Sequence, residues 1–199
     1  MVTTNEFVET SAIPKSLVYE TLNGRPLYYK GYHDVVAGIL KPEDIMGSSD
    51  LQSIIVMVLA GTLWNKVDRK QYQLATNQSR LHVGLGDNLS ADVAIFEKSS
   101  LPRLKGKYFD VPPKIVLEVD IKIDLNEIGS DVAYISEKTQ ELINFGVERV
   151  FWVLSKIRKV IIIQPNQDWI VTDWGNDITI MDDCIINIKR LLDEEEITY

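Results

Sequence analysis

The sequence is poor in the side chains that form disulfides or bind zinc. Its 199 residues include one cysteine, Cys184, and two histidines, His33 and His82. A single cysteine cannot form an internal disulfide, and the three residues lack the spacing of a zinc site. A disulfide scaffold and a zinc enzyme are therefore both disfavoured.

Long apolar runs are missing as well. No run reaches the roughly 18 apolar residues that a membrane-spanning helix needs, and residues 1–16 are polar and contain two glutamates, unlike a secretory signal. We therefore expect a cytoplasmic protein without a membrane segment. We expect residues 1–15 to form a loosely ordered lead-in and residues 16–199 to form a single domain.

Positive charge is also scarce, with 21 Lys and Arg against 29 Asp and Glu and a net charge of -8. Phosphate contact needs clustered cations, so this balance weighs against a broad nucleic-acid surface but permits a local basic cleft. The most basic stretch, 97–113, reads as a loop in which aromatic residues lie among the cations. It is either a solvated loop or a flap that contacts phosphates. Its candidate nucleic-acid contacts are Arg103, Lys105 and Lys107.

The first half of the chain predicts a hairpin followed by a helix. Asn23-Gly24 is a strong turn signal between two β-prone segments. Over residues 49–67, apolar side chains recur at the spacing of a helix that lies on a sheet. The segment 71–85 is expected to form two strands with a turn around Asn77.

The second half predicts two parallel strands joined by a helix. The runs 115–120 and 150–154 are apolar and β-prone, and a helix from about 130 to 145 lies between them, with Gly146 as its stop. A helix between strands indicates a crossover and therefore a partly parallel sheet. Further short antiparallel strands are expected at 159–165, 169–174, 178–181 and 185–188, the last ending in KRLLDEEE.

Two of the predicted buried strands carry acidic residues. Alternation in SADVAIFEK gives Asp92 one side of its strand, and alternation in IVLEVDI puts Glu118 and Asp120 on one face. Such carboxylates repel each other and lose hydration, so they need a cation nearby or a strand end that is open to solvent. On the following helix, Lys138 lies beside the apolar stripe, where it can either snorkel to solvent or reach an acidic cleft. The pattern suggests a divalent-metal site.

The ordered set of segments resembles the PD-(D/E)XK nuclease superfamily. Within it, the chain is most similar to the restriction-endonuclease family formerly classed as a domain of unknown function. The resemblance runs from about Tyr19 to Leu192. Its segments are YETLNG, ADVAIF, PPKIVLEV, and Lys138 with Gly146, Val147 and Trp152. It implies an α/β (α+β) fold with a restriction-endonuclease-like core: a mixed central β-sheet flanked by helices, with additional antiparallel strands at both ends.

The resemblance also implies a site and an activity. The metal ligands would be Asp92, Glu118 and the backbone carbonyl of Val119, and the ion would be Mg²⁺ or Mn²⁺. The superfamily's usual lysine lies two residues after the glutamate, where this chain has Asp120, which becomes a candidate further ligand. The lysine would then be Lys138, on the helix. Lys122 is the alternative catalytic lysine, since its parity matches that of Glu118.

The implied reaction is hydrolysis of DNA phosphodiester bonds by a homodimer. Catalytic residues would be Asp92, Glu118 and Lys138. One alternative is an inactive nuclease fold that serves as a dimeric binding or regulatory module, favoured by the acidic charge and the missing lysine after Glu118. Another is a glycosidase that uses the two carboxylates, which explains neither Lys138 nor the order of the segments.

Overall fold

The chain folds around one mixed β-sheet of eight strands in the order β2-β1-β4-β5-β6-β7-β8, with β3 paired to β4 beside this path. The computed structural model describes residues 13–199, apart from the side chain of Glu127. The strands of this sheet are β1 (Val18–Leu22), β2 (Arg25–Tyr28), β3 (Tyr72–Gly84), β4 (Asp87–Glu97), β5 (Ile115–Val119), β6 (Arg149–Leu154), β7 (Lys159–Ile163) and β8 (Ile170–Asp173). A second, two-stranded sheet consists of β9 (Ile178–Met181) and β10 (Cys184–Ile186).

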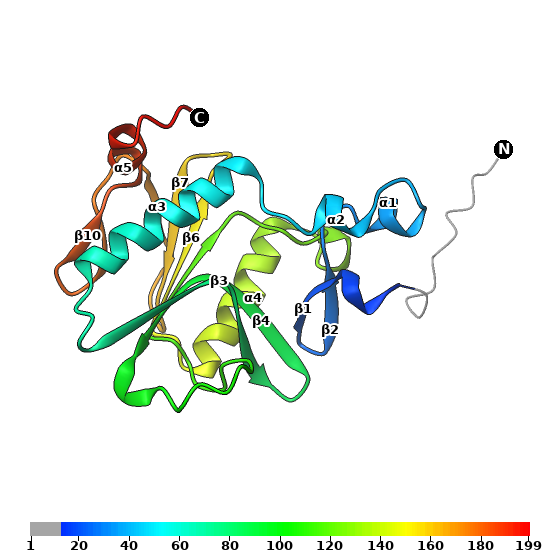
Figure 1. Cartoon of the computed structure of the whole chain (residues 1–199), viewed down its shortest axis with the longest axis horizontal. Coiled ribbons are helices and arrows are strands. Elements are labelled where there is room, and N and C mark those ends of the chain that lie inside the picture. The colour runs from blue at the N-terminus through cyan, green and yellow to red at the C-terminus, as the bar shows by residue number, and fades with distance from the viewer. Residues whose placement is uncertain (1–12) are drawn as a thin grey trace.

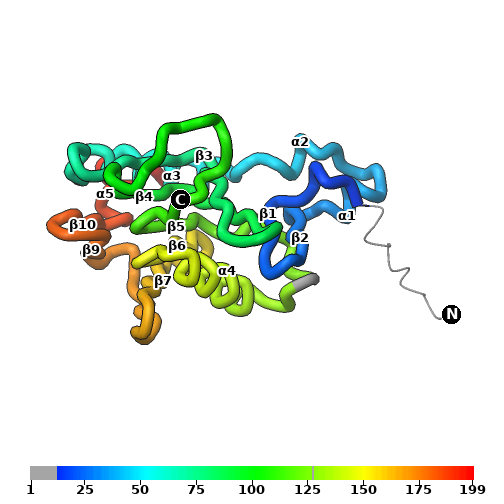
Figure 2. The backbone as a smooth tube through the Cα atoms, turned by 90° about the horizontal axis from the view of Figure 1, so that it is seen from below, coloured from blue at the N-terminus to red at the C-terminus, as the bar shows by residue number. Residues whose placement is uncertain are grey.

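Helices cover both faces of the large sheet (Figures 1 and 2). The helices are α1 (Tyr32–Val36), α2 (Pro42–Ile45), α3 (Asp50–Lys66), α4 (Asp131–Phe145) and α5 (Ile188–Glu194). Side chains of α3 pack with one set of alternating residues of β4, including Val93 and Ile95. Side chains of α4 pack with the other set, including Ala94 and Phe96. The predicted α/β architecture, with a mixed sheet between helices, is confirmed.

The crossover predicted between residues 115–120 and 150–154 is confirmed. β5 and β6 are parallel, with Glu118 beside Trp152, and α4 connects them. Ser130 caps the start of α4 by accepting a hydrogen bond from the Ala133 amide, and Gly146 ends the helix at a φ of 121°. This connection brings the α4 side chains under the strand that carries Glu118.

At the N-terminal end, the hairpin predicted at Asn23-Gly24 is confirmed. Both turn residues have positive φ, 53° and 72°, the conformation that two-residue hairpins with matching strand twist require. β1 then joins the rest of the sheet through one registered pair, Thr21 with Asn88 on β4. The predicted lead-in, 1–15, falls almost entirely outside the described residues.

The prediction of two strands in 71–85 is wrong. β3 runs through the whole segment and pairs with β4 along its length, with a β-bulge between Thr76 and Ser79. Asn77 and Gln78 both have positive φ, 67° and 54°, and they insert extra backbone without reversing the chain. The turn signal at Asn77 therefore marks a bulge.

The C-terminal prediction is partly wrong. The last strand, β10, ends at Ile186, and the segment after it forms α5, which starts at Asn187 as its cap and was not predicted. The short helices α1 and α2 were also not predicted, because each spans too few residues to show a helical period. Among the helices of residues 13–199, none is long and apolar enough to cross a membrane.

Candidate active site

The two strand acids face each other across a pair of neighbouring strands. β4 and β5 are antiparallel with Val93 opposite Leu117, and one further step in this register sets Asp92 opposite Glu118. Both side chains lie on the α4 side of the sheet, and both residues are buried, with 3% and 2% of their surface exposed. The sequence prediction that these acids lie on buried strands is correct.

Lys138 of α4 reaches into this acidic site and does not snorkel to solvent. Its Nζ lies 3.1 Å from Oε1 of Glu118 and 3.0 Å from Oε2 of Glu20, a residue of β1. It also donates a hydrogen bond of 3.3 Å to the hydroxyl of Tyr134, which in turn donates to Glu20. The ring centres of Tyr134 and Trp152 are each 5.6 Å from Nζ. The lysine is fully buried between carboxylates and aromatic faces.

Lys122, the alternative lysine, belongs to the same cluster. Its Nζ pairs with Oδ1 of Asp92, while Oδ2 of Asp92 accepts a hydrogen bond of 2.8 Å from the Val119 amide. The carbonyl of Val119 accepts a hydrogen bond from the side chain of Gln52, in the first turn of α3. The carboxylates of Asp92 and Glu118 therefore each have a lysine beside them: Lys122 for Asp92 and Lys138 for Glu118.

The electrostatics of this cluster favour one retained proton. Three carboxyl groups meet two ammonium groups, which leaves one surplus negative charge when all are ionised. Burial raises the pKa of Glu118 from 4.5 to about 8, with a further rise from Asp92 and Glu20, against the attraction of Lys138 and Lys122. Burial alone would lower the pKa of Lys138, but Glu118 and Glu20 outweigh it and hold that pKa well above its ordinary value. At neutral pH the cluster keeps a proton on Glu118 and a charge on Lys138.

Asp120 does not join this cluster, and the prediction that it shares a face with Glu118 is wrong. The strand ends at Val119, and Asp120 has a φ of 58°, so strand alternation does not extend to it. Its carboxylate accepts hydrogen bonds of 2.7 and 2.6 Å from the amide and hydroxyl of Ser155, just after β6. These hydrogen bonds hold the start of the turn between β6 and β7. Both oxygens of Asp120 are therefore already used and do not serve as metal ligands in this arrangement.

The donors of the cluster suit a hard divalent ion by their chemistry. Oε1 of Glu118 accepts no hydrogen bond among the described residues, but it lies 3.1 Å from the ammonium group of Lys138. The other donors are occupied, because Lys122 pairs with Asp92 and Gln52 bonds the Val119 carbonyl. Within residues 13–199, no three His, Cys, Asp or Glu side chains are arranged to hold a metal. The residues thus fit a divalent ion only after Lys122 leaves Asp92 and Glu118 shares its carboxylate between Lys138 and the ion.

Sequence reasoning missed Glu20, Tyr134 and Gln52 as members of this site. Glu20 lies in the YETLNG segment. The sequence signal that could have identified it is an acidic residue within a short strand that also carries the buried residues Tyr19 and Leu22. It also accepts hydrogen bonds of 3.2 and 3.3 Å from the amide and hydroxyl of Ser90. Tyr134 and Gln52 read as ordinary helix residues, because their roles depend on which strands their helices cover.

The predicted nucleic-acid contacts lie apart from this cluster along the chain. Arg103, Lys105 and Lys107 are exposed on the loop between β4 and β5, and no described contact joins them to Asp92 or Glu118. The prediction that residues 97–113 form a loop is correct, except for one short 3₁₀ turn at Lys98–Ser100.

Comparison with known proteins supports the fold. No protein-family model and no curated protein matches the chain. Among solved structures, the chain is similar to a "putative nuclease belonging to DUF820" from Anabaena variabilis, with a TM-score of 0.64 and 15% identity over 87% of this chain and 89% of that one. At this identity the likeness shows the fold alone. The type IIG restriction endonuclease BpuSI matches 59% of this chain and 12% of its own, at 17% identity and a TM-score of 0.30, which carries no argument.

Proposed function

We propose that this protein is a metal-dependent nuclease that hydrolyses phosphodiester bonds in DNA. The observation that carries the proposal is the facing pair Asp92 and Glu118 on adjacent central strands, each paired with a lysine, of which Lys138 is fully buried. Burial of so many charged groups costs free energy and does little for stability, so a catalytic role is a better account of the cluster. The shared fold with a protein described as a putative nuclease supports the same reading.

Asp92, Glu118 and the Val119 carbonyl would hold a Mg²⁺ or Mn²⁺ ion. The ion supplies Lewis acidity and positive charge beside a phosphate. The carboxylate of Asp92 is oriented by the Val119 amide, and that of Glu118 by Lys138. Loss of the proton from Glu118 leaves a carboxylate beside Lys138 that can serve as a ligand.

Lys138 is our first candidate for the lysine that stabilises developing negative charge, and Lys122 is the second. Lys138 is enclosed by Glu20 and Glu118 and has a fixed position. Lys122 has 9% of its side chain exposed and follows the irregular end of β5, so it is the one nearer solvent. If Lys138→Ala cleaves DNA normally while Lys122→Ala does not, the assignment passes to Lys122.

The test pairs metal binding with cleavage. Calorimetry with Mn²⁺ should show binding to the wild type and none to Glu118→Gln, and Mg²⁺-dependent cleavage of DNA should fall by at least about 100-fold in Asp92→Asn. The control Asp173→Asn removes an exposed acid that pairs with Lys159, and it should bind and cleave as the wild type does. Failure of the wild type to bind either ion, with or without DNA, would refute the proposal.

That negative result would favour the alternative, an inactive nuclease fold that acts as a binding or regulatory module. The burial of the site supports this alternative, since Asp92, Glu118 and Lys138 are almost fully buried and are paired with one another or with Lys122 and Glu20. Homodimerisation stays a prediction under both readings, and sedimentation of the full chain would test it.

A further inference from the structure

The loop 101–114 forms an arch that is attached to β3 and β4 near its C-terminal end, at Phe109. The amide of Phe109 donates a hydrogen bond of 2.9 Å to the carbonyl of Arg80, and the amide of His82 donates one of 2.8 Å to the carbonyl of Phe109. The Phe109 ring also stacks on Phe96, with centres 4.5 Å apart. These contacts join the loop to β3 and β4, so the residues just before Phe109 project from an ordered base.

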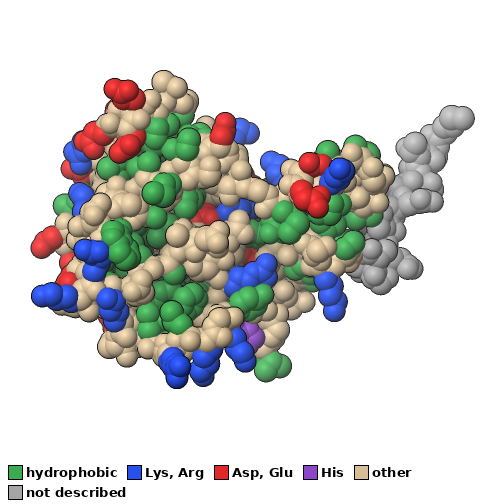
Figure 3. Space-filling view, in the orientation of Figure 1, with side chains coloured by type: hydrophobic (Ala, Val, Ile, Leu, Met, Phe, Trp, Pro, Cys, Tyr) green, Lys and Arg blue, Asp and Glu red, His purple; other side chains and the backbone are tan. Residues whose placement is uncertain are grey.

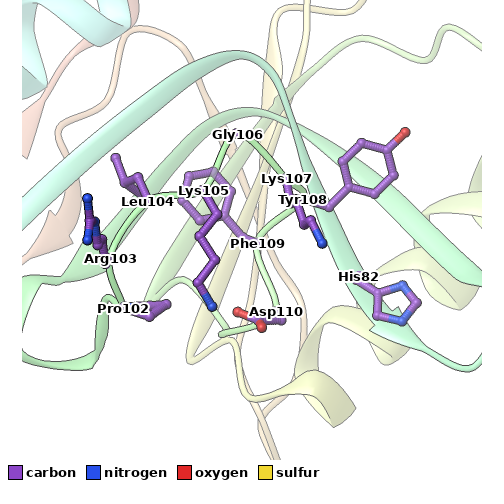
Figure 4. Close-up of a pocket in the computed structure, with 10 residues that line it drawn as sticks. All are labelled: His82, Pro102, Arg103, Leu104, Lys105, Gly106, Lys107, Tyr108, Phe109 and Asp110. Carbon is purple, nitrogen blue, oxygen red and sulfur yellow. The ribbon is translucent and has the colours of Figure 1, made fainter.

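A pocket of about 780 Å³ lies within this arch, as Figure 4 shows. Its volume falls in the range of about 300 to 1,000 Å³ that is typical of small-ligand sites. In Figure 4, Arg103 lies at one end of the pocket, Tyr108 and His82 lie at the other, and Lys105 lies between them. The pocket therefore has cations along its length and an aromatic ring at one end.

The cations of the pocket have few acidic neighbours among the described residues. Arg103, Lys105 and Lys107 are exposed, and none of them forms an ion pair within residues 13–199. The segment 98–109 contains no acidic residue, and among the residues that line the pocket only Asp110 carries a carboxylate. Figure 3 shows lysine and arginine side chains gathered along the lower edge, where Figure 1 places this loop. In a chain of net charge -8, such a group of unpaired cations suits an anionic ligand.

The aromatic end of the pocket is held in place by Arg80 of β3. The guanidinium of Arg80 lies 5.5 Å from the centre of the Tyr108 ring, and its Nη1 donates a hydrogen bond of 3.3 Å to the Tyr108 hydroxyl. The tyrosine still has 48% of its surface exposed. A tyrosine ring that is held by an arginine and still half exposed offers a surface on which a flat group can stack.

We propose that this pocket binds an unpaired nucleotide of single-stranded DNA, with the base stacked on Tyr108 and the flanking phosphates on Lys105, Lys107 and Arg103. A ligand with a flat ring and a chain of anions matches both features of the pocket. Bases of a duplex are stacked inside the helix and cannot reach Tyr108. This inference rests on the proposed function and names the form of DNA that the nuclease would take.

The strand connection places this pocket close to the acidic cluster. His82, which lines the pocket, pairs with Asn88 of β4, four residues from Asp92. At about 3.3 Å per residue along a strand, the separation along β4 is roughly 13 Å. A bound strand with a nucleotide in the pocket would thus have a neighbouring phosphate within a few nucleotides of Asp92.

The experiment is fluorescence anisotropy on the full chain, with Ca²⁺ in place of Mg²⁺ so that cleavage does not interfere. The probes are labelled oligodeoxythymidylate and the same strand annealed to oligodeoxyadenylate. The wild type should bind the single strand more tightly than the duplex, and Tyr108→Ala should weaken single-strand binding by about 5- to 150-fold, the effect of losing one base–aromatic stack. The double variant Lys105→Gln, Lys107→Gln should lower the slope of log affinity against log salt by about 1.4.

Trp64→Ala is the matched control. Trp64 on α3 is also exposed, at 45%, and also lies against an arginine, Arg69, at 4.8 Å, but it does not line the pocket. Its removal should leave binding unchanged. Equal or tighter binding of the duplex, or wild-type binding by Tyr108→Ala, would overturn the inference. Because binding is measured without turnover, a protein that binds single strands through Tyr108 but never cleaves them would refute the proposed nuclease function and leave this inference standing.

Discussion

Replacing Lys138 by methionine removes the positive charge at the centre of the buried cluster while retaining most of the side-chain length. In the wild type, the ammonium group has Glu20 at 3.0 Å and Glu118 at 3.1 Å and no exposed surface. In the variant, Glu20 keeps hydrogen bonds from Tyr134 and Ser90 but loses its cation. A buried negative charge would then lack a counter-ion.

Breaking a buried ion pair by removing one partner costs about 3–5 kcal/mol, a large part of the roughly 5–15 kcal/mol that stabilises a domain. Urea unfolding at pH 7 with EDTA, followed by tryptophan fluorescence, measures the loss. Adding Glu20→Gln and Glu118→Gln to Lys138→Met should recover most of it, because no unpaired charge would remain.

The matched control is Lys159→Met. Lys159 lies 2.8 Å from Asp173, but the two side chains are 37% and 62% exposed, so the loss should be roughly 0–1 kcal/mol. If Lys138→Met costs no more than Lys159→Met, then Lys138 carries no net charge in the folded protein, and the electrostatic account of the cluster is wrong.

Three other results are expected. In the folded protein the pKa of Glu118 is about 8, whereas in the unfolded chain Glu118 loses its proton near the ordinary value of 4.5. The free energy of unfolding without metal should therefore fall as pH rises from about 5 to 8. Glu118→Gln should flatten this profile, and an unchanged slope would contradict the expectation. Lys122→Ala should raise the calorimetric affinity for Mn²⁺, since it frees an oxygen of Asp92, and weaker binding would argue against competition between lysine and metal. Gly146→Ala should lower the free energy of unfolding in urea by about 1–3 kcal/mol, because the φ of Gly146 is 121° and a Cβ would lie 2.9 Å from Pro112. Gly61→Ala, within α3 and with no atom near the added Cβ, should raise it by about 0.5–1 kcal/mol. Equal effects of the two substitutions would refute the strain argument.

Regular periodicity made most of the fold predictable. The helix over 49–67, for which the sequence offers Ser49 or Asp50 as the cap, the helix ended by Gly146 and the turn at Asn23-Gly24 each combine a hydrophobic pattern with a specific local signal. All three elements are confirmed, and Ser49 is the cap. The signal at Asn77 was ambiguous, because a residue with positive φ serves a bulge as well as a turn. Only the pairing of β3 with β4 over its whole length decides between them.

The site was predictable only as far as strand alternation reaches. Asp92 and Glu118 were found because each lies on a strand whose alternate residues are buried. Asp120 was misplaced because alternation says nothing about where a strand ends. Glu20 was missed because it meets Lys138 across more than a hundred residues of chain, a contact that depends on the position of β1 in the sheet.

The way in which β1 joins the sheet has a consequence for local stability. One registered pair, Thr21 with Asn88, connects β1 to β4, and Glu20 adds polar contacts with Lys138, Tyr134 and Ser90 to the packing of the buried apolar side chains of the hairpin. Detaching the hairpin exposes the cluster to water and removes a carboxylate from it in the same event. Amide hydrogen exchange in β1 and β2 therefore reports on the charge state of the site, and any ligand that replaces Glu20 as the partner of Lys138 loosens the N-terminal hairpin.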